Sequence, residues 1–182
     1  LNEKEQIMGK VFSGIGCKLA LAGLFLLAMP SAHAVSKIVI TGNIKAAPCE
    51  IDGANGTVSV NLGDDISAAV LATSGAFSPW VEFPLTLKNC PSTTTSVVAT
   101  FSGTAADEGA SLYKSTGSSR RVQIELQNSQ GANLGNGKSM AQLVNRATNE
   151  AKFNLRARAF SVNGGSTPGS IEGALQVTFV YQ

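Results

Sequence analysis

The sequence predicts an all-β protein, of the immunoglobulin-like β-sandwich class, on three observations. Short segments rich in Val, Ile, Thr and Phe recur and are separated by Gly, Asn, Ser and Pro, a pattern typical of strands joined by turns. No stretch of useful length has the period of an amphipathic helix. Six or seven short strands in about 130 residues, together with one early pair of cysteines, fit such a sandwich.

The first 34 residues are predicted to be a cleaved signal peptide. Lys10 and Lys18 precede an apolar stretch at 19–30, and Ala32-His33-Ala34 has the small-x-small pattern of a cleavage site. The alternative, a transmembrane helix, needs about 20 apolar residues, and this stretch is shorter. A start of translation at Met8 stays open.

Cleavage after Ala34 leaves a mature chain that is long enough for one domain. That part has 11 Lys and Arg against 10 Asp and Glu, a balance that favours neither a nucleic acid nor a membrane surface as partner. Cys17 is lost with the signal, so Cys49 and Cys90 remain as an even pair in an exported chain and are predicted to form a disulfide. The alternative is two free thiols. A bridge closing 41 residues is worth about 4 kcal/mol in the chain-entropy model.

The strands are predicted in order from alternation and from the turn residues between them. Leu155, Ala157 and Ala159 alternate with Arg156 and Arg158, so one face of that strand is buried. Turns are predicted where Gly and Asn cluster, a short helical turn at 65–72, and a polar loop at 102–121. The predicted strands are 57–62, 80–90, 96–103, 122–128, 151–162 and 170–182.

The residues needed for common catalytic sites are missing. Loss of His33 leaves no histidine, which removes Ser-His-Asp and Cys-His catalysis and most zinc or copper sites. The segment 134–140 resembles a phosphate-binding loop, but Ala132 stands where its first glycine is required. No Gly-x-Ser-x-Gly motif occurs. The sequence therefore predicts a protein that is not an enzyme and has no cofactor and no metal.

The two ends of the mature chain carry a more specific pattern. At the N-terminus, 35–48 alternates like a strand that has no evident neighbour. At the C-terminus, Gly169 is fourteenth from the end, Tyr181 is penultimate, and alternate apolar residues lie between them. These ends, with "AAPCEI" around Cys49 and "LTLKNCP" around Cys90, resemble the chaperone–usher pilins, and most of all the type 1 fimbrial minor subunits such as the adaptor next to the tip adhesin.

The resemblance implies an incomplete immunoglobulin-like sandwich at 49–182 that lacks its last strand. The N-terminal extension at 35–48 is then a donor strand that completes the sandwich of a neighbouring subunit, a form of β-augmentation. By the same resemblance, the donor residues that face the groove are Ser36, Ile38, Ile40, Gly42 and Ile44. Ser36 departs from the apolar residue usual at that position. The strand expected to contact first a periplasmic chaperone and then the donor carries Gly169, Ile171, Gly173, Leu175, Val177, Phe179 and Tyr181.

The expected function is that of a structural subunit of a bacterial fimbria, or pilus, that polymerises by donor-strand exchange and supports cell adhesion. The implied partners are neighbouring pilin subunits, a periplasmic chaperone, an outer-membrane usher and a tip adhesin, with no nucleic acid and no small-molecule substrate. The chain is then exported through the periplasm to the fimbria at the cell surface. Two alternatives stay open: a major shaft pilin, and a self-contained secreted β-sandwich that binds a ligand and needs no chaperone.

Overall fold

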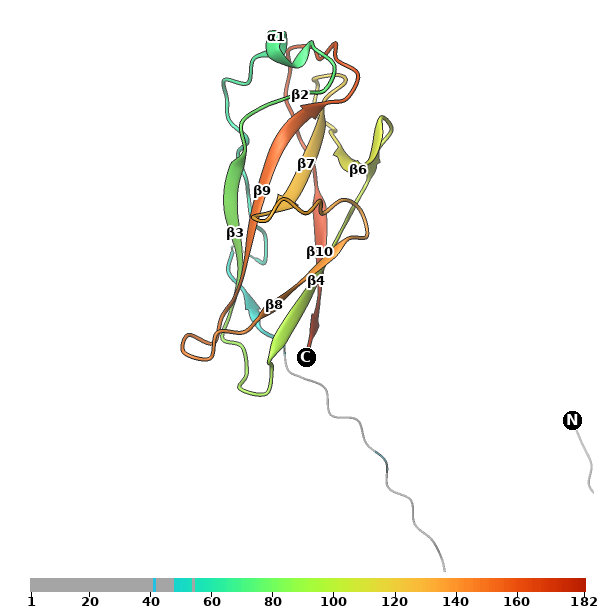
Figure 1. The fold of residues 1–182 in the computed structure, drawn as a ribbon. Coiled ribbons are helices and arrows are strands. Elements are labelled where there is room, and N and C mark those ends of the chain that lie inside the picture. The colour runs from blue at the N-terminus through green and yellow to red at the C-terminus, as the bar shows by residue number, and fades with distance from the viewer. Residues whose placement is uncertain (1–40, 42–47, 54) are drawn as a thin grey trace, which may run out of the picture. The chain divides into compact units, whose positions relative to one another are not determined.

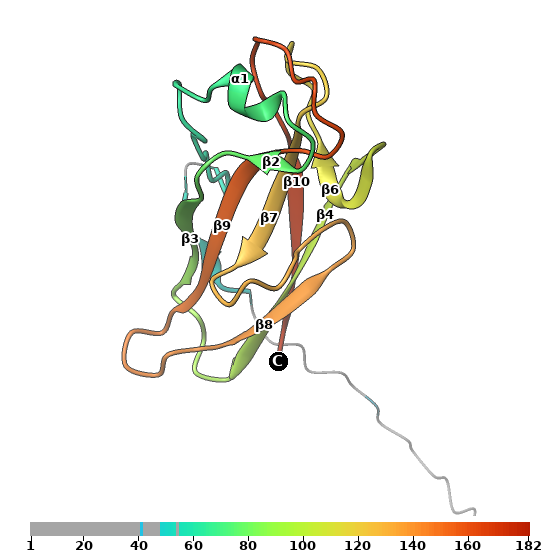
Figure 2. The same ribbon diagram turned by 45° about the horizontal axis from the view of Figure 1, so that its top comes forward.

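The computed structural model describes residues 41, 48–53 and 55–182. From residue 48 onward, two antiparallel β-sheets make up the fold (Figures 1 and 2). The predicted all-β sandwich is confirmed. No helix in the described part of the chain is long and apolar enough to cross a membrane.

The larger sheet has the strand order β1-β3-β9-β7-β6-β5, and β2 also pairs with β9. The smaller sheet has the order β10-β4-β8, so β10 runs alongside β4 (Figure 2). One short helix, α1 (Ala68–Leu71), precedes β2 and begins at Ser67, whose side chain accepts a hydrogen bond from the backbone of Val70. The strand bounds are β1 Glu50–Ile51, β2 Ala76–Phe77, β3 Val81–Lys88, β4 Ser96–Gly103, β5 Ala105–Ala106, β6 Gly109–Lys114, β7 Gln123–Asn128, β8 Ser139–Leu143, β9 Ala151–Ser161 and β10 Leu175–Tyr181.

The core lies between the two sheets and is built by alternate residues. On β9, the residues that face inward are all buried, among them Phe153, which has no exposed surface. On β4, Val97, Ala99 and Phe101 are equally buried. This is the period of two that the sequence predicts for these strands, and β3, β4, β7, β9 and β10 fall within five of the six predicted strands.

The segment 102–121 is not the polar loop that the sequence predicts. It contains β5 and β6, which pair with each other, and β6 continues the larger sheet beside β7. Tyr113 on β6 is 1% exposed, and its hydroxyl donates a hydrogen bond to the carbonyl of Leu134 at 2.7 Å. Because many of the residues around Tyr113 are Gly, Ser or Ala, the hydrophobic alternation typical of a strand is weak in this segment. The buried ring of Tyr113 nevertheless stabilises a strand there. β8, in which three of five residues are small or polar, is a further strand that the sequence does not predict, as are the two-residue strands β1 and β2.

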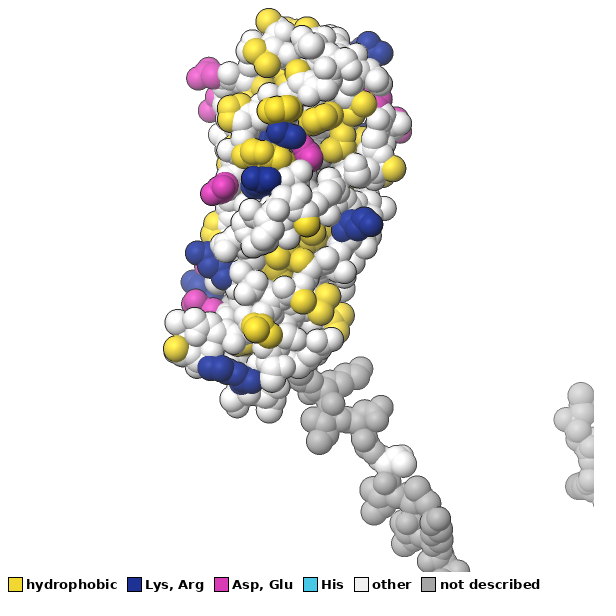
Figure 3. All heavy atoms as spheres, in the orientation of Figure 1, with side chains coloured by type: hydrophobic (Ala, Val, Ile, Leu, Met, Phe, Trp, Pro, Cys, Tyr) yellow, Lys and Arg dark blue, Asp and Glu magenta, His cyan; other side chains and the backbone are white. Residues whose placement is uncertain are grey.

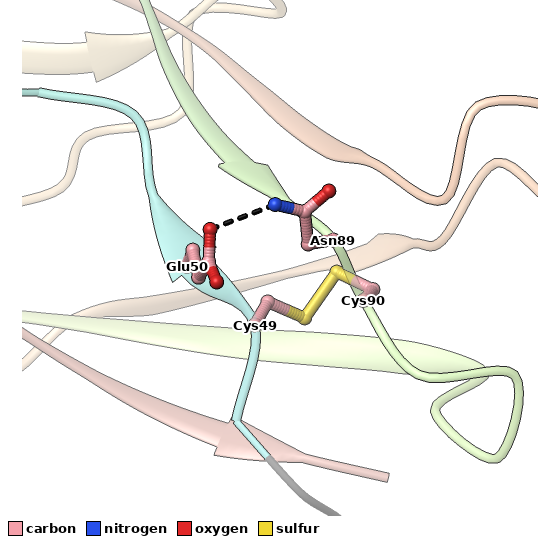
Figure 4. Close-up of a disulfide and its surroundings, with 4 residues drawn as sticks. All are labelled: Cys49, Glu50, Asn89 and Cys90. Atoms are coloured by element: carbon pink, nitrogen blue, oxygen red, sulfur yellow. Dashed lines mark hydrogen bonds between the residues drawn. A yellow bond between two sulfur atoms is a disulfide. The ribbon is translucent and has the colours of Figure 1, made fainter.

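The predicted disulfide between Cys49 and Cys90 is confirmed (Figure 4). It connects Cys49, just before β1, to Cys90, just after β3. The two strands β1 and β3 pair with each other and are antiparallel. Beside it, the Asn89 amide donates a hydrogen bond to the Glu50 carboxylate at 2.7 Å. Both cysteines are buried. The disulfide therefore holds the start of β1 against the end of β3.

Candidate functional site

β10 is only partly covered by the rest of the protein. It pairs with β4 along its whole length, from Leu175 opposite Gly103 to Tyr181 opposite Val97. Its second side pairs with no strand in the part of the chain that the structure describes. The side chains of β10 that face the core are half-buried, whereas those of β4 behind them are fully buried. The core therefore reaches the surface along β10.

The residues across from β10 do not form the strand that the sequence predicts at 57–62. Only Thr57 makes a β-bridge, and residues 58–62 have no regular structure. Val58 is 36% exposed, while Val60 and Leu62 are half-buried. Val58, Val60 and Leu62 do alternate in sequence, but a strand also needs a partner for its backbone, and within residues 48–53 and 55–182 no strand pairs with residues 58–62.

A groove lies between residues 56–66 and the C-terminal segment. It consists of two hollows of about 420 and 280 Å³ that share Val60, Gly173 and Leu175 as lining residues. Its floor includes the inward-facing side chains of Phe83, Leu85, Phe101, Leu126 and Leu155 in the one hollow and Leu71 and Ile124 in the other. Asp64 is the single charged residue among those that line it. The groove is thus suited to an apolar segment.

The C-terminal strand begins later than predicted. Residues 170–174 do not join the smaller sheet, and β10 starts only at Leu175. Instead, the backbone of Ser119 donates a hydrogen bond to the carbonyl of Ser170 at 3.0 Å, and that of Thr116 to Glu172 at 2.8 Å. This segment is therefore attached to the loop between β6 and β7, on the side of the larger sheet.

Two glycines leave room for their neighbours where the C-terminal segment crosses between the sheets: Gly169 for the backbone of Ser119, and Gly173 for the side chain of Ile124. A Cβ at Gly169 would lie 2.5 Å from the backbone nitrogen of Ser119. A Cβ at Gly173 would lie 2.4 Å from Cδ1 of Ile124, closer than any real contact. Without a side chain at Gly173, Ile124 itself forms the floor of the groove at that point.

The structure brings together most of the predicted groove residues. Gly169, Ile171, Gly173, Leu175, Val177 and Phe179 all line the groove. Tyr181 does not line it but packs at its end, with its ring 6.4 Å from that of Phe179. Burial raises the pKa of the Tyr181 phenol, and a backbone hydrogen bond from Cys49 opposes this shift. The predicted donor residues Ser36, Ile38, Ile40, Gly42 and Ile44 lie outside the described residues.

Sequence reasoning did not identify the far wall and the floor of the groove. Val60, Leu62 and Ile66 form part of the wall, and Ile124 part of the floor. Their apolar character was visible in the sequence, but which strands lie next to the gap depends on the topology. No group of three or more potential metal ligands occurs among residues 48–53 and 55–182.

Comparisons with known proteins agree with this geometry. Residues 38–182 match the family described as "Fimbrial protein". Protein FimG of Escherichia coli is 36% identical over 162 residues, which cover 88% of this chain and 94% of that protein. The S-fimbrial adhesin protein SfaS of Escherichia coli is 40% identical over 152 residues, covering 83% and 88%. Among solved structures, the P pilus rod subunit PapA has a TM-score of 0.62 at 20% identity, covering 75% of this chain and 100% of that one.

Proposed function

This chain belongs to the fimbrial protein family, and we propose that its groove beside β10 receives a strand from a neighbouring subunit. It is a structural subunit of a fimbria, exported through the periplasm to the cell surface. Its contribution to adhesion is then mechanical: it connects other subunits into a fibre and has no catalytic role. Donor-strand complementation through the groove is the step that makes this connection.

The observation that carries the proposal is the one-sided burial of β10. Leu175, Val177 and Phe179 face the groove and are half-buried, and on the open side of β10 no strand of the described residues pairs with its backbone groups. An incoming strand offers both apolar side chains and backbone partners. Unpaired backbone groups cost about 1–3 kcal/mol each when they are buried without a partner. A single inserted strand therefore removes two sources of instability together.

The proposed donor is the extension at 35–48 of the next subunit. Nine residues from Ser36 to Ile44 extend about 30 Å as a strand, close to the length of the C-terminal segment that lines the groove. The three isoleucines Ile38, Ile40 and Ile44 fall on one face of such a strand, together with Gly42. An antiparallel orientation relative to β10 agrees with every strand pairing in the described part of the chain.

We further propose that a periplasmic chaperone occupies the groove before assembly, and that an outer-membrane usher mediates the exchange. Within the fibre we assign the chain to a minor position, as the adaptor next to a tip adhesin. Two observations support this assignment. The two chain ends resemble those of minor subunits, and the sequence is 40% identical to that of SfaS, a fimbrial adhesin protein. A major shaft position is the alternative.

The test is a strand-exchange assay with the subunit purified in complex with its periplasmic chaperone. A peptide with the sequence of residues 35–48 should displace the chaperone and form a stable complex with the subunit. The matched control is the same peptide with Ile40→Asp, which should displace it much more slowly. A subunit that is a soluble monomer without any chaperone, and that ignores both peptides, would contradict the proposal.

A further inference from the structure

Asp64 is the single charged residue among those described that line the groove beside β10. It lies between Leu62 and Ile66, at the hollow that also includes Leu71 of α1. Figure 3 shows acidic side chains at the upper left of the molecule, near its α1 end, and the basic side chains in this view lie apart from them. A carboxylate adds nothing to the apolar character of the groove, so its position at the rim indicates another role.

The carboxylate of Asp64 is weakly engaged within its own subunit. Its Oδ1 accepts one hydrogen bond, from the Asn61 amide at 3.4 Å, which is long for such a bond. The local turn is stabilised instead by the backbone of Gly63, which donates to Oδ1 of Asn61 at 2.9 Å. Among the described residues, no Lys or Arg forms an ion pair with Asp64. The side chain is exposed, so its charge is available to a partner that enters the groove.

The hollow that contains Asp64 lies at the N-terminal end of β10. It is lined by Ile171, just before the strand, whereas the other hollow is lined by Phe179 further along it. A donor strand that pairs with β10 in the antiparallel direction therefore has its C-terminal end in the hollow of Asp64. Ser36 and Ile44 are eight residues apart, as are Ile171 and Phe179. When Ser36 lies opposite Phe179, Ile44 therefore lies opposite Ile171.

Lys45 directly follows Ile44 in the donor sequence. Because successive side chains of a strand point to opposite faces, Lys45 of a donor strand points away from the core when Ile44 points into it. Segment 35–48 contains two lysines, Lys37 and Lys45, and no acidic residue. In the antiparallel orientation, Lys45 is the lysine at the hollow of Asp64, whereas Lys37 lies at the other end of the groove, where the lining residues described are uncharged. The charges of the two partners are thus complementary at one end of the groove.

We propose that Asp64 is a positioning residue that pairs with Lys45 of the incoming donor strand and thereby sets the register of insertion. The inference rests on the proposed function, because it needs a strand in the groove. A slip by two residues keeps the same side chains facing inward, so the apolar alternation alone does not distinguish one register from the next. Such a slip moves Lys45 by about 6.6 Å and brings Asn43 or Ala47 beside Asp64 instead. Both are uncharged, so only one register forms the ion pair.

Asp65 provides a comparison at the neighbouring position. Like Asp64, it is exposed and has no ion-pair partner among the described residues. It lines a different hollow, which includes Val70, Phe77 and Pro79 but not the C-terminal segment. The two carboxylates therefore place the same charge at adjacent positions, but only Asp64 lines the groove.

The test is a double-mutant cycle on the rate at which a peptide of residues 35–48 displaces the chaperone from the purified subunit–chaperone complex. Asp64→Asn in the subunit, or Lys45→Gln in the peptide, should each slow insertion about two- to fivefold at low ionic strength, which is the effect of one exposed ion pair. The two changes together should slow insertion no further than either change alone. The reversed pair, Asp64→Lys with Lys45→Asp, should insert faster than either reversed partner with an unmodified one. High salt should abolish these differences, because the pair is exposed.

The matched controls are Asp65→Asn in the subunit and Lys37→Gln in the peptide, and both should leave the rate close to that of the unmodified pair. A crystal structure of the peptide complex should show Ile44 opposite Ile171 and Lys45 beside Asp64. Equal losses in Asp64→Asn and Asp65→Asn, additive losses in the cycle, coupling of Asp64 to Lys37, or a crystal structure with Lys45 away from Asp64 would each overturn the pairing. These outcomes leave the proposed function intact, since the peptide still inserts. Failure of the unmodified peptide to insert would contradict the proposed function, and the pairing with it.

Discussion

Gly173 decides the depth of the groove at one point. Its missing side chain leaves Ile124 exposed to the groove, and any Cβ would overlap with Cδ1 of Ile124. Replacing it by Val should displace Ile124 and fill the groove, at a cost of about 1–3 kcal/mol from overpacking. We expect Gly173→Val to slow insertion of the 35–48 peptide, measured as the rate of chaperone displacement.

The matched control for Gly173→Val is Ala174→Val, at the next residue, which is exposed and lines neither hollow of the groove. Its rate of peptide insertion should stay close to that of the unmodified subunit. A Gly173→Val subunit that accepts the peptide as fast as the control would show that this position does not shape the groove.

Tyr113 should make the stability of the fold depend on pH in the alkaline range. Burial raises the pKa of its phenol from 10.0 to about 12. Because the folded protein favours the neutral form, this stabilisation is fully present below about pH 10 and is lost as the pH rises toward 12. Denaturant unfolding between pH 8 and pH 12 should show this decrease in the free energy of unfolding.

Tyr113→Phe separates the two contributions of this residue. Loss of the hydrogen bond to Leu134 should cost about 1 kcal/mol at pH 8, and the decrease above pH 10 should become smaller. Tyr181→Phe is the control, since Tyr181 is only half-buried and should leave most of the decrease in place. An unchanged pH profile in Tyr113→Phe would contradict this assignment.

At the scale of the element, the two faces of β10 should respond in opposite ways to a charge. Phe179 faces the groove, with its ring 6.2 Å from that of Phe153 in the core, whereas the neighbouring Val180 is 54% exposed. Phe179→Asp should abolish capture by the chaperone, because it removes about 1.5–3 kcal/mol of apolar burial and adds the desolvation of a carboxylate. The measurement is recovery of the subunit–chaperone complex from the periplasm.

Val180→Asp is the matched control on the same strand. It places the same charge one residue further along, on the solvent face, and recovery of the complex should be nearly normal. Similar losses in the two variants would mean that the charge acts through the stability of β10 and not through the groove.

The disulfide should contribute most of its stabilisation through the unfolded chain. Closing a loop of 41 residues is worth about 4 kcal/mol, a large share of the stability of a domain of this size. We expect the Cys49→Ser, Cys90→Ser double variant to unfold at a clearly lower denaturant concentration, with the slope m changing as the unfolded state expands. A midpoint within error of the unmodified protein would contradict a structural role for the bridge.

The strands that sequence reasoning predicted correctly share one property. β3, β4, β7, β9 and β10 contain branched or aromatic residues at alternate positions, and these residues face the core. Tyr113 on β6 and Met140 on β8 lie among small or polar residues, so the alternation is hidden there. At 57–62 the apolar residues alternate clearly, but residues 58–62 form no strand. A strand also needs a neighbouring strand to which its backbone can hydrogen-bond, and the sequence pattern does not show whether one is present.

At the scale of the whole molecule, the sandwich carries an open groove, and the sequence alternates apolar residues at 35–48, which we propose to be the donor. The groove-lining side of the C-terminal segment could be predicted from the sequence because a period of two fixes which residues share a face. The floor at Ile124 and the wall at Val60 could not, since they depend on which strands meet across the gap. The disulfide could be predicted because assigning Cys17 to a signal peptide leaves Cys49 and Cys90 as the one possible pair.

The central claim is that the groove accepts a strand and that 35–48 donates one. The most direct measurement is cell-free assembly of chaperone–subunit complexes, followed by electrophoresis without heating, using the mature subunit and a variant that lacks residues 35–47. The variant should still be captured by the chaperone and should still accept a strand, but it should add to a fibre only once, at an end that it cannot extend. A variant that fails to bind the chaperone, or that still occupies internal positions of the fibre, would contradict the account, because 35–47 would then belong to the fold of its own subunit.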